Sequence, residues 1–246
     1  MTESTTIFGL HAVRTLLQQR PERAALLILQ KGRDDARIDE IMKLAQARGI
    51  KTELRDSKAL DRLAGDERHQ GACLQIHSVG ALGEGALDDL LDSITTPPLL
   101  LVLDGVQDPH NLGACLRTAD AAGVTAVIVP KDRAAGLSAT VRKVASGAAE
   151  TVPLIQVTNL ARTLRWLKDR EIWIVGTDDQ APHPLYASKL TGPLAVVLGA
   201  EGTGLRRLTR ENCDALVSIP MRGVVESLNV SVATGVLLYE ALRQRQ

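Results

Sequence analysis

The sequence has 246 residues, 45% of them hydrophobic, and its 29 Lys and Arg residues balance its 29 Asp and Glu residues. A chain of this length can bury the core of one large domain or two modest ones. Zero net charge excludes a generally basic protein that binds any polyanion, so nucleic acid would have to be bound by local patches.

Three cysteines, Cys73, Cys115 and Cys213, lie far apart in the sequence. Their odd number and the lack of a C-x-x-C spacing indicate neither a disulfide framework nor a zinc site. The histidines are equally scattered, so we expect no metal. The sequence has no basic N-terminal start followed by an apolar stretch, and no run of about 20 apolar residues. We therefore expect reduced thiols in a soluble, cytoplasmic protein without a membrane span.

Residues 1–77 predict a small α/β domain of alternating elements. The patterns place helices and strands at 10–18 (helix), 26–30 (strand), 34–48 (helix), 50–54 (strand), 57–63 (helix) and 72–77 (strand). The segment His69-Gln70-Gly71, just before the last strand, either contacts RNA phosphate or ribose or is a turn with exposed polar side chains.

Residues 78–97 predict the boundary between two domains. The segment has glycines at Gly80, Gly83 and Gly85, carries four acidic residues and has no basic residue. This composition is typical of a flexible linker. Residues 87–94 have room for one or two acidic helical turns before Pro97-Pro98 prevents a helix from continuing.

Residues 98–246 alternate apolar runs with helical patterns. Continuous apolar runs are typical of parallel strands buried on both faces, and the alternation predicts a doubly wound α/β sheet. Strands are expected at 99–103, 124–129, 153–157, 172–176, 194–198 and 215–219, with helices at 111–123, 138–149, 159–169, 205–211 and 227–244.

Small and polar residues follow two of the predicted strands. The strand at 194–198 ends in Gly199-Ala200-Glu201-Gly202-Thr203-Gly204, and the loop after 215–219 delivers Glu226-Ser227-Leu228-Asn229 to the last helix. The carboxyl ends of parallel strands meet at one edge of a sheet, and glycine lets the backbone approach a ligand closely. The pattern predicts one compact site built largely from backbone.

Several polar residues near this edge have two interpretations. Asn111 either caps its helix or contributes to the site. Arg117, among small apolar neighbours, needs a carboxylate or phosphate partner. Glu201 pairs with Arg117, holds a neighbouring backbone amide or is a solvated loop acid. Ser227 either caps the last helix or belongs to the site. Asp178-Asp179 resembles a solvated loop.

Other motifs exclude common alternatives. The order Gly199-x-x-Gly202-x-Gly204 differs from the dinucleotide fingerprint, and neither G-x-x-x-x-G-K-[ST] nor G-x-S-x-G occurs. Five aromatic residues are too few for base-stacking platforms. A nicotinamide-dependent oxidoreductase is therefore a weak interpretation.

Three motifs, in this order, resemble those of the SpoU/TrmH class of RNA ribose 2′-O-methyltransferases. They are Asn111-Leu112-Gly113-x-x-x-Arg117, Leu198-Gly199-Ala200-Glu201-Gly202-x-Gly204, and Ile219-Pro220-Met221 through Ser227-Leu228-Asn229. The N-terminal half, with Phe8-Gly9-x-His11 and Arg68-His69-Gln70-Gly71, is similar to bacterial members that methylate a guanosine ribose in the peptidyl-tRNA-binding loop of 23S rRNA.

The resemblance implies a C-terminal α/β domain whose parallel sheet contains a deep trefoil knot. It also implies an N-terminal α/β domain of the ribosomal-protein L30e type that binds RNA. It implies S-adenosylmethionine as methyl donor and a homodimer with active sites at the knot interface. The donor would be held by the backbone of Gly199, Ile219 and Leu228, with Glu201, Pro220 and Met221 nearby.

The resemblance also implies roles for the polar side chains. Arg117 would act with an RNA phosphate in removing the proton of the 2′-hydroxyl, and Asn111 would fix Arg117 or the ribose. Glu201 would hold its loop, while Ser227 and Asn229 would shape the donor pocket and the hydroxyl site. Two alternatives stay open: a tRNA ribose 2′-O-methyltransferase of the same class, and a ribosome-assembly factor that binds RNA without turnover.

The same reading proposes basic clusters as local RNA contacts, because the chain has no net positive charge. They are Arg142-Lys143, Arg162 with Arg165, and Arg206-Arg207 with Arg210. Taken alone, each of these pairs favours the interpretation as a solvated face.

Overall fold

The protein is described here by a computed structural model that covers residues 4–33, 35–65, 68–77 and 80–246. The predictions that fall on Asp34, Ser78 and Val79 lie outside these residues. The chain divides into two compact units, Met1–Val79 and Gly80–Gln246, and each unit has its own hydrophobic core.

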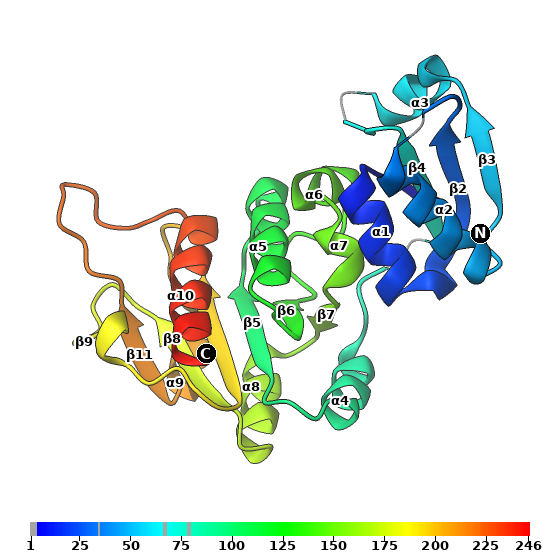
Figure 1. Ribbon diagram of the computed structural model, residues 1–246. Helices are drawn as coiled ribbons and strands as arrows, with labels where there is room; N and C mark the ends of the chain where they lie inside the picture. Colours follow the sequence, from blue (N-terminus) through cyan, green and yellow to red (C-terminus); the bar gives the residue numbers. More distant parts are fainter. Residues whose placement is uncertain (1–3, 34, 66–67, 78–79) are drawn as a thin grey trace. The chain divides into compact units, whose positions relative to one another are not determined.

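The N-terminal unit is a four-stranded sheet in the order β1-β4-β2-β3 (Figure 1). Two helices cover one face around Leu27 and Leu74, and a third packs Leu60 against Ile28 on the other face. In chain order the elements are β1 (Ser4–Phe8), α1 (Leu10–Gln19), η1 (Pro21–Arg23), β2 (Ala24–Gln30), α2 (Ala36–Ala47), β3 (Thr52–Arg55), α3 (Ser57–Ala64) and β4 (Ala72–His77).

The sequence patterns did not predict strand β1. Its run Ser-Thr-Thr-Ile-Phe is polar for most of its length, so local apolar periodicity gives no signal. The strand exists because its backbone pairs antiparallel with β4, from Ser4 opposite His77 to Phe8 opposite Cys73. Pairing with a distant segment here decides the local structure.

The C-terminal unit is a seven-stranded sheet in the order β7-β6-β5-β10-β8-β11-β9, and every neighbouring pair is parallel. In chain order its elements are α4 (Glu84–Ser93), β5 (Leu99–Asp104), α5 (Pro109–Ala121), β6 (Ala126–Pro130), α6 (Ala139–Ala145), α7 (Ala148–Thr151), β7 (Leu154–Val157), α8 (Leu160–Asp169), β8 (Trp173–Thr177), β9 (His183–Pro184), η2 (Leu185–Ala187), β10 (Leu194–Gly199), α9 (Arg207–Asn212), β11 (Ala215–Ser218) and α10 (Val230–Gln244).

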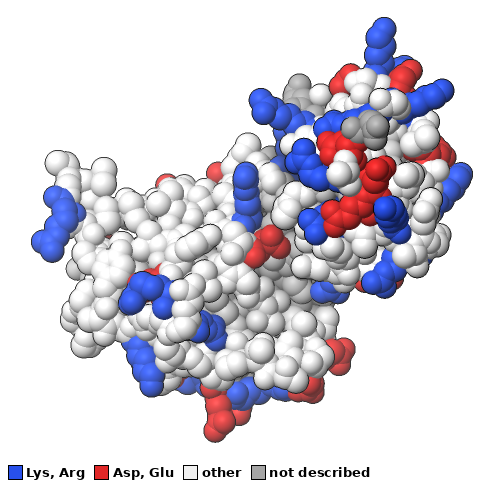
Figure 2. All heavy atoms as spheres, viewed as in Figure 1, with Lys and Arg blue, Asp and Glu red and all other residues white. Residues whose placement is uncertain are grey.

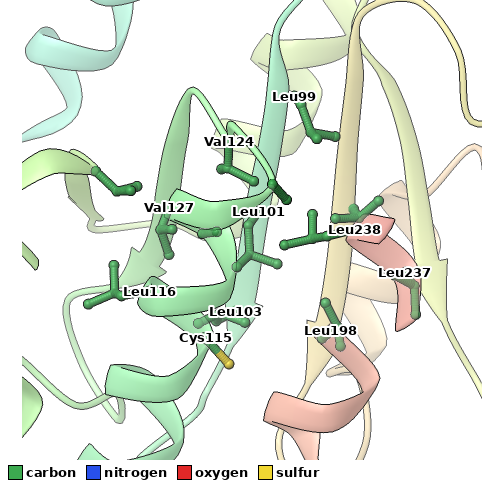
Figure 3. Close-up of a cluster of buried hydrophobic side chains, with 14 of the residues drawn as sticks. Leu99, Leu101, Leu103, Cys115, Leu116, Val124, Val127, Leu198, Leu237 and Leu238 are labelled. Carbon is green, nitrogen blue, oxygen red and sulfur yellow. The ribbon is translucent and has the colours of Figure 1, made fainter. Parts of the chain in front are cut away.

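Strand β5 shows why the predicted strands of the C-terminal unit are apolar along their whole length. Its side chains alternate between the two faces of the sheet. Leu101 packs with Leu116 of α5 and Leu238 of α10 on one face (Figure 3). Leu100 and Val102 pack with residues of α4 and α8 on the other face. Helices on both faces confirm the expected doubly wound α/β fold.

The strand order reverses around β8. Strand β10 lies between β5 and β8, whereas β11 lies on the far side of β8. The chain therefore changes sides of β8 before α10 returns to pack against α5 and β10. The trefoil knot that the resemblance implies stays a prediction. The order places the carboxyl ends of β8, β10 and β11 at the same edge.

The expected flexible linker contains a packed helix. Helix α4 buries Leu87 and Leu91 against the sheet. Its acidic residues face basic residues of α8 and its C-cap: Glu84 lies 2.8 Å from Arg162, and Asp88 lies 2.6 Å from the C-cap Arg170. The acidic composition that suggested a solvated linker thus supplies the counter-charges of a neighbouring helix.

The predicted helix over 138–149 is two helices, α6 and α7, separated by a kink at Ser146 and Gly147. Both kink residues have positive φ, 51° for Ser146 and 95° for Gly147. Helix α6 packs closely on α5, because a Cβ on Gly113 would lie 2.7 Å from Cβ of Val144. No side chain fits at Gly113 without moving α6.

We predict opposite outcomes for alanine at two helical glycines. Gly113→Ala will lower the melting temperature, since overpacking costs about 1–3 kcal/mol. Gly235→Ala in α10 is the matched control. Its new Cβ would meet Thr118 at an ordinary 3.9 Å, and alanine is a better helix former than glycine. Thermal unfolding of both variants is the measurement, and equal melting temperatures would contradict the close α5–α6 contact.

Candidate functional site: a cavity at the ends of β8, β10 and β11

A cavity of about 360 Å³ opens at the carboxyl ends of β8, β10 and β11. The candidate residues that line it are Gly199, Glu201, Ile219, Met221, Ser227 and Leu228. Asn111, Arg117, Pro220 and Asn229 are outside the lining among the described residues. The structure thus gathers most of the predicted donor-binding positions in one place, from the loops after β10 and β11.

The loop after β10 forms one wall of the cavity by folding back on itself. Gly204 N donates a hydrogen bond of 2.9 Å to Ala200 O. A Cβ at Gly199 would overlap the backbone of Gly204 and Leu205. Gly202 and Gly204 have φ values of 77° and 63°, which side-chain-bearing residues rarely adopt. The turn therefore requires glycine at all three positions: Gly199 has no space for a Cβ, and Gly202 and Gly204 have positive φ.

A buried carboxylate at the end of β5 anchors the far end of the loop. Asp104 is 1% exposed, and its Oδ2 accepts a hydrogen bond of 2.9 Å from Arg206 N. Arg206 Nε lies 3.2 Å from the other carboxylate oxygen. Burying a carboxylate is costly unless it is paired and hydrogen-bonded, so this arrangement fixes Arg206 relative to β5. Sequence reasoning missed Asp104 because it reads as the polar end of an apolar strand.

The cavity carries an excess of negative charge. The described acidic residues in its lining are Asp178, Asp179, Glu201 and Glu226, and among these described lining residues Arg210 alone is positive. The expectation that Asp178 lies in a solvated loop is wrong: its side chain is 5% exposed and pairs with Arg210. The partner comes from α9, too far along the chain for local composition to indicate.

Two asparagines join the start of α10 to the start of α5. Asn229 Nδ2 donates a hydrogen bond of 2.9 Å to Asn111 Oδ1. Asn229 Oδ1 accepts from Ser231 N at 2.9 Å, so Asn229, and not Ser227, caps α10. Asn111 does not cap α5 either, because Asp108 does. This hydrogen bond holds Asn111 beside Asn229, the residue directly after Leu228 in the cavity lining.

Arg117 lies on the exposed side of α5. Its Nη1 donates a hydrogen bond of 3.4 Å to Ser146 Oγ at the kink between α6 and α7. Glu201 is exposed, and within the described residues no ion pair joins it to Arg117. The structure therefore leaves the guanidinium directed toward solvent and accessible to an anionic ligand.

The cysteines do not supply a nucleophile. Burial raises the pKa of Cys73 and of Cys115 to about 11. Burial, followed by the neighbouring Asp214 carboxylate, raises the pKa of Cys213 to about 12. All three thiols therefore stay protonated at neutral pH, and the thiolate is the reactive form.

The proposed basic clusters are largely neutralised by acids. Arg142 pairs with the buried Glu150, Arg162 with Glu84, and Arg207 with Glu211. On the face in Figure 2, the charged side chains of the C-terminal unit are scattered over a mostly uncharged surface. Most of these arginines therefore have an acidic partner within the same unit, and their contact with RNA stays a prediction.

The described part of the chain shows neither a metal-binding cluster nor a helix that could cross a membrane. No group of three or more His, Cys, Asp or Glu side chains there is arranged to hold a metal ion. None of its helices combines the length and the apolar character that crossing a bilayer requires.

Family comparisons match both units. The SpoU rRNA Methylase family model matches residues 98–239. A second model, RNA 2′-O ribose methyltransferase substrate binding, matches residues 6–80. Together they cover nearly all of the strands described above.

Relatives match over the full length. The 23S rRNA (guanosine-2′-O-)-methyltransferase RlmB of Pectobacterium atrosepticum is 57% identical over 242 residues, 98% of this chain and 99% of that protein. RlmB of Shewanella oneidensis is 56% identical over 246 residues, 100% of both chains. The SpoU methyltransferase AviRb from Streptomyces viridochromogenes, crystallised with AdoMet, is 22% identical with a TM-score of 0.74, over 98% of this chain and 90% of that one. This last likeness shows the fold.

Proposed function

The chain belongs to the SpoU rRNA methylase family, and from this membership we infer that it is an S-adenosylmethionine-dependent 23S rRNA (guanosine-2′-O-)-methyltransferase. Identity of 57% over nearly the whole of both chains, in both units, carries this conclusion. We further propose that the target guanosine lies in the peptidyl-tRNA-binding loop. We also propose that the enzyme works in the cytoplasm, where rRNA is assembled into ribosomal subunits.

The cavity fits the methyl donor. Its volume of about 360 Å³ is within the usual range for small-ligand sites, roughly 300–1,000 Å³. The acidic lining suits a ligand with a sulfonium and an ammonium group, and Ile219 and Leu228 offer apolar contacts to an adenine ring. The backbone at Gly199 is exposed to the ligand without a side chain between them. When bound, S-adenosylmethionine supplies an activated methyl group that needs no metal.

The chain's own part in catalysis is placement. Holding the ribose oxygen in line with the methyl group can lower the barrier by roughly 7–11 kcal/mol. Arg117 binds a phosphate of the substrate RNA and so sets the position of the neighbouring ribose. An arginine side chain keeps its proton in proteins, so we assign proton acceptance to phosphate or water and electrostatic positioning to Arg117.

The remaining site residues act on the donor pocket or the ribose. Asn111 and Asn229, joined by their hydrogen bond, fix the helix starts beside the hydroxyl site. Glu201 adds negative charge to the pocket wall on the loop after β10, and Ser227 lines the pocket next to Leu228. Pro220 acts through its neighbours, because it is exposed and the described lining passes from Ile219 to Met221.

The N-terminal unit is proposed to bind the RNA substrate. The structure brings together two segments that the sequence separates by about sixty positions: Gln70 Oε1 accepts a hydrogen bond of 3.3 Å from Leu10 N. Gly9 N donates to Ala72 O at 3.1 Å. His11 and Arg68 are exposed on this junction and are available to RNA.

A homodimer is proposed from the surface of α10. Val232 and Tyr239 are 52% and 51% exposed, although they lie two turns apart on one face of a helix whose other face is buried. Exposed apolar residues in such a row are typical of a protein interface. A second copy is the partner, because the family relationship implies a homodimer. Arg117 is not among the described residues that line the pocket. An active site completed by a second copy at an interface is consistent with this separation.

The activity has a direct test. Purified enzyme should transfer a labelled methyl group to unmodified 23S rRNA, and mapping should find one 2′-O-methylguanosine. Transfer to tRNA alone would identify the tRNA methyltransferase of the same class. Binding of rRNA without transfer to any RNA would identify the assembly factor.

Arg117→Ala should reduce methylation by at least two orders of magnitude, while S-adenosylmethionine binding, measured by calorimetry, stays near wild type. The reason is that the guanidinium acts on RNA and lies outside the donor cavity. Lys189→Ala, at an exposed lysine outside the proposed basic clusters and the cavity lining, is the control and should keep full activity. Loss of donor binding in Arg117→Ala would contradict the assignment.

Val232→Glu with Tyr239→Glu should convert the dimer to a monomer, as measured by light scattering during size-exclusion chromatography. The charges would be buried against a second copy at a cost of several kcal/mol. Leu208→Glu on α9, at a residue 49% exposed, is the control and should leave the mass unchanged. A wild-type monomer would contradict the dimer proposal.

A further inference from the structure

Ser146 occupies a backbone conformation that serine rarely adopts. It ends α6 at φ 51° and ψ 44°, in the left-handed region, and Gly147 follows at φ 95°. Glycine reaches this region without steric cost, whereas a residue with a Cβ does not. A glycine would therefore suit the turn at Ser146 better, and strained residues of this kind often mark functional positions.

The kink is held firmly against α5, the helix that carries Arg117. Before the kink, Val144 packs on Gly113, one helical turn ahead of Arg117 on the same face of α5. After the kink, Thr151 Oγ1 donates a hydrogen bond to Asp120. Contacts on both sides of the kink thus fix its position next to Arg117.

An ion pair joins α6 to α7 across the kink. Arg142 of α6 pairs with Glu150 of α7, and the Glu150 residue is 6% exposed. This pair spans the two kink residues, so the backbone at Ser146 is set by α6 and α7 together. The Ser146 side chain is not needed for that ion pair.

What the side chain does is contact Arg117. Ser146 Oγ accepts the hydrogen bond of 3.4 Å from Arg117 Nη1. An arginine carries five N–H donors, so one hydrogen bond to Ser146 leaves the others for a phosphate. A long exposed side chain otherwise samples many rotamers, and a fixed acceptor at one end narrows that range.

We propose that Ser146 is a positioning residue for the methyl-transfer reaction: its hydroxyl holds the Arg117 guanidinium in the orientation that receives an RNA phosphate. The strained backbone is kept because a glycine there would lose this hydroxyl. The inference rests on the proposed role of Arg117.

The test is a pair of substitutions with crossed effects. Ser146→Gly relieves the backbone strain but removes the hydroxyl, so its melting temperature should equal or exceed that of wild type. Its kcat should fall about ten-fold, because one hydrogen bond to a charged group is lost. Ser146→Thr keeps the hydroxyl and adds a branched Cβ, so it should melt lower and retain kcat near wild type. S-adenosylmethionine affinity should stay unchanged in both.

Arg117→Ala and the double variant Arg117→Ala/Ser146→Gly complete the cycle. The double variant should be no slower than Arg117→Ala, since Ser146 acts through Arg117. Wild-type kcat in Ser146→Gly would overturn the inference, as would a kcat loss accompanied by a lower melting temperature, which is the mark of a purely structural residue. Full activity of Arg117→Ala would instead overturn the proposed role of Arg117, and the inference with it.

Discussion

The structure depends on one close approach of backbone to backbone. At Gly199 the chain leaves the central strand β10 and turns back so tightly that the following loop leaves no space for a Cβ. The buried carboxylate of Asp104 fixes the end of this loop through Arg206. The result is a pocket wall made largely of main chain.

A second close approach, on α5, organises the part of the unit that carries Arg117. The absence of a side chain at Gly113 lets α6 lie against α5. The start of α5 is tied to α10 by Asn111 and Asn229, and the exposed guanidinium of Arg117 meets the α6–α7 kink. One helix therefore links the start of α10, which follows the pocket residue Leu228, with the arginine proposed to act on RNA. The proposed reaction needs little more than placement of its two substrates, because its methyl donor is already activated. In this proposal the pocket backbone places the donor and the Arg117 guanidinium places the RNA.

Sequence patterns predicted the features that arise from local physics. Continuous apolar runs identified the buried parallel strands. The glycine-rich loop after β10 and the small and polar residues before α10 identified the cavity. The patterns failed where a distant partner decides the structure. Strand β1 forms only by pairing with β4, the acidic α4 packs against basic α8, and Asp178 is buried by Arg210 of α9. The contact between Arg117 and Ser146 has no sequence signature, because it arises from helix packing.

The central claim is that the main-chain pocket at the end of β10 presents the methyl donor. A crystal structure of the enzyme with S-adenosylmethionine tests it most directly. The account predicts electron density for the donor in the cavity, against the backbone of Gly199, Ile219 and Leu228. Density for the donor at any other place on the chain would contradict the account.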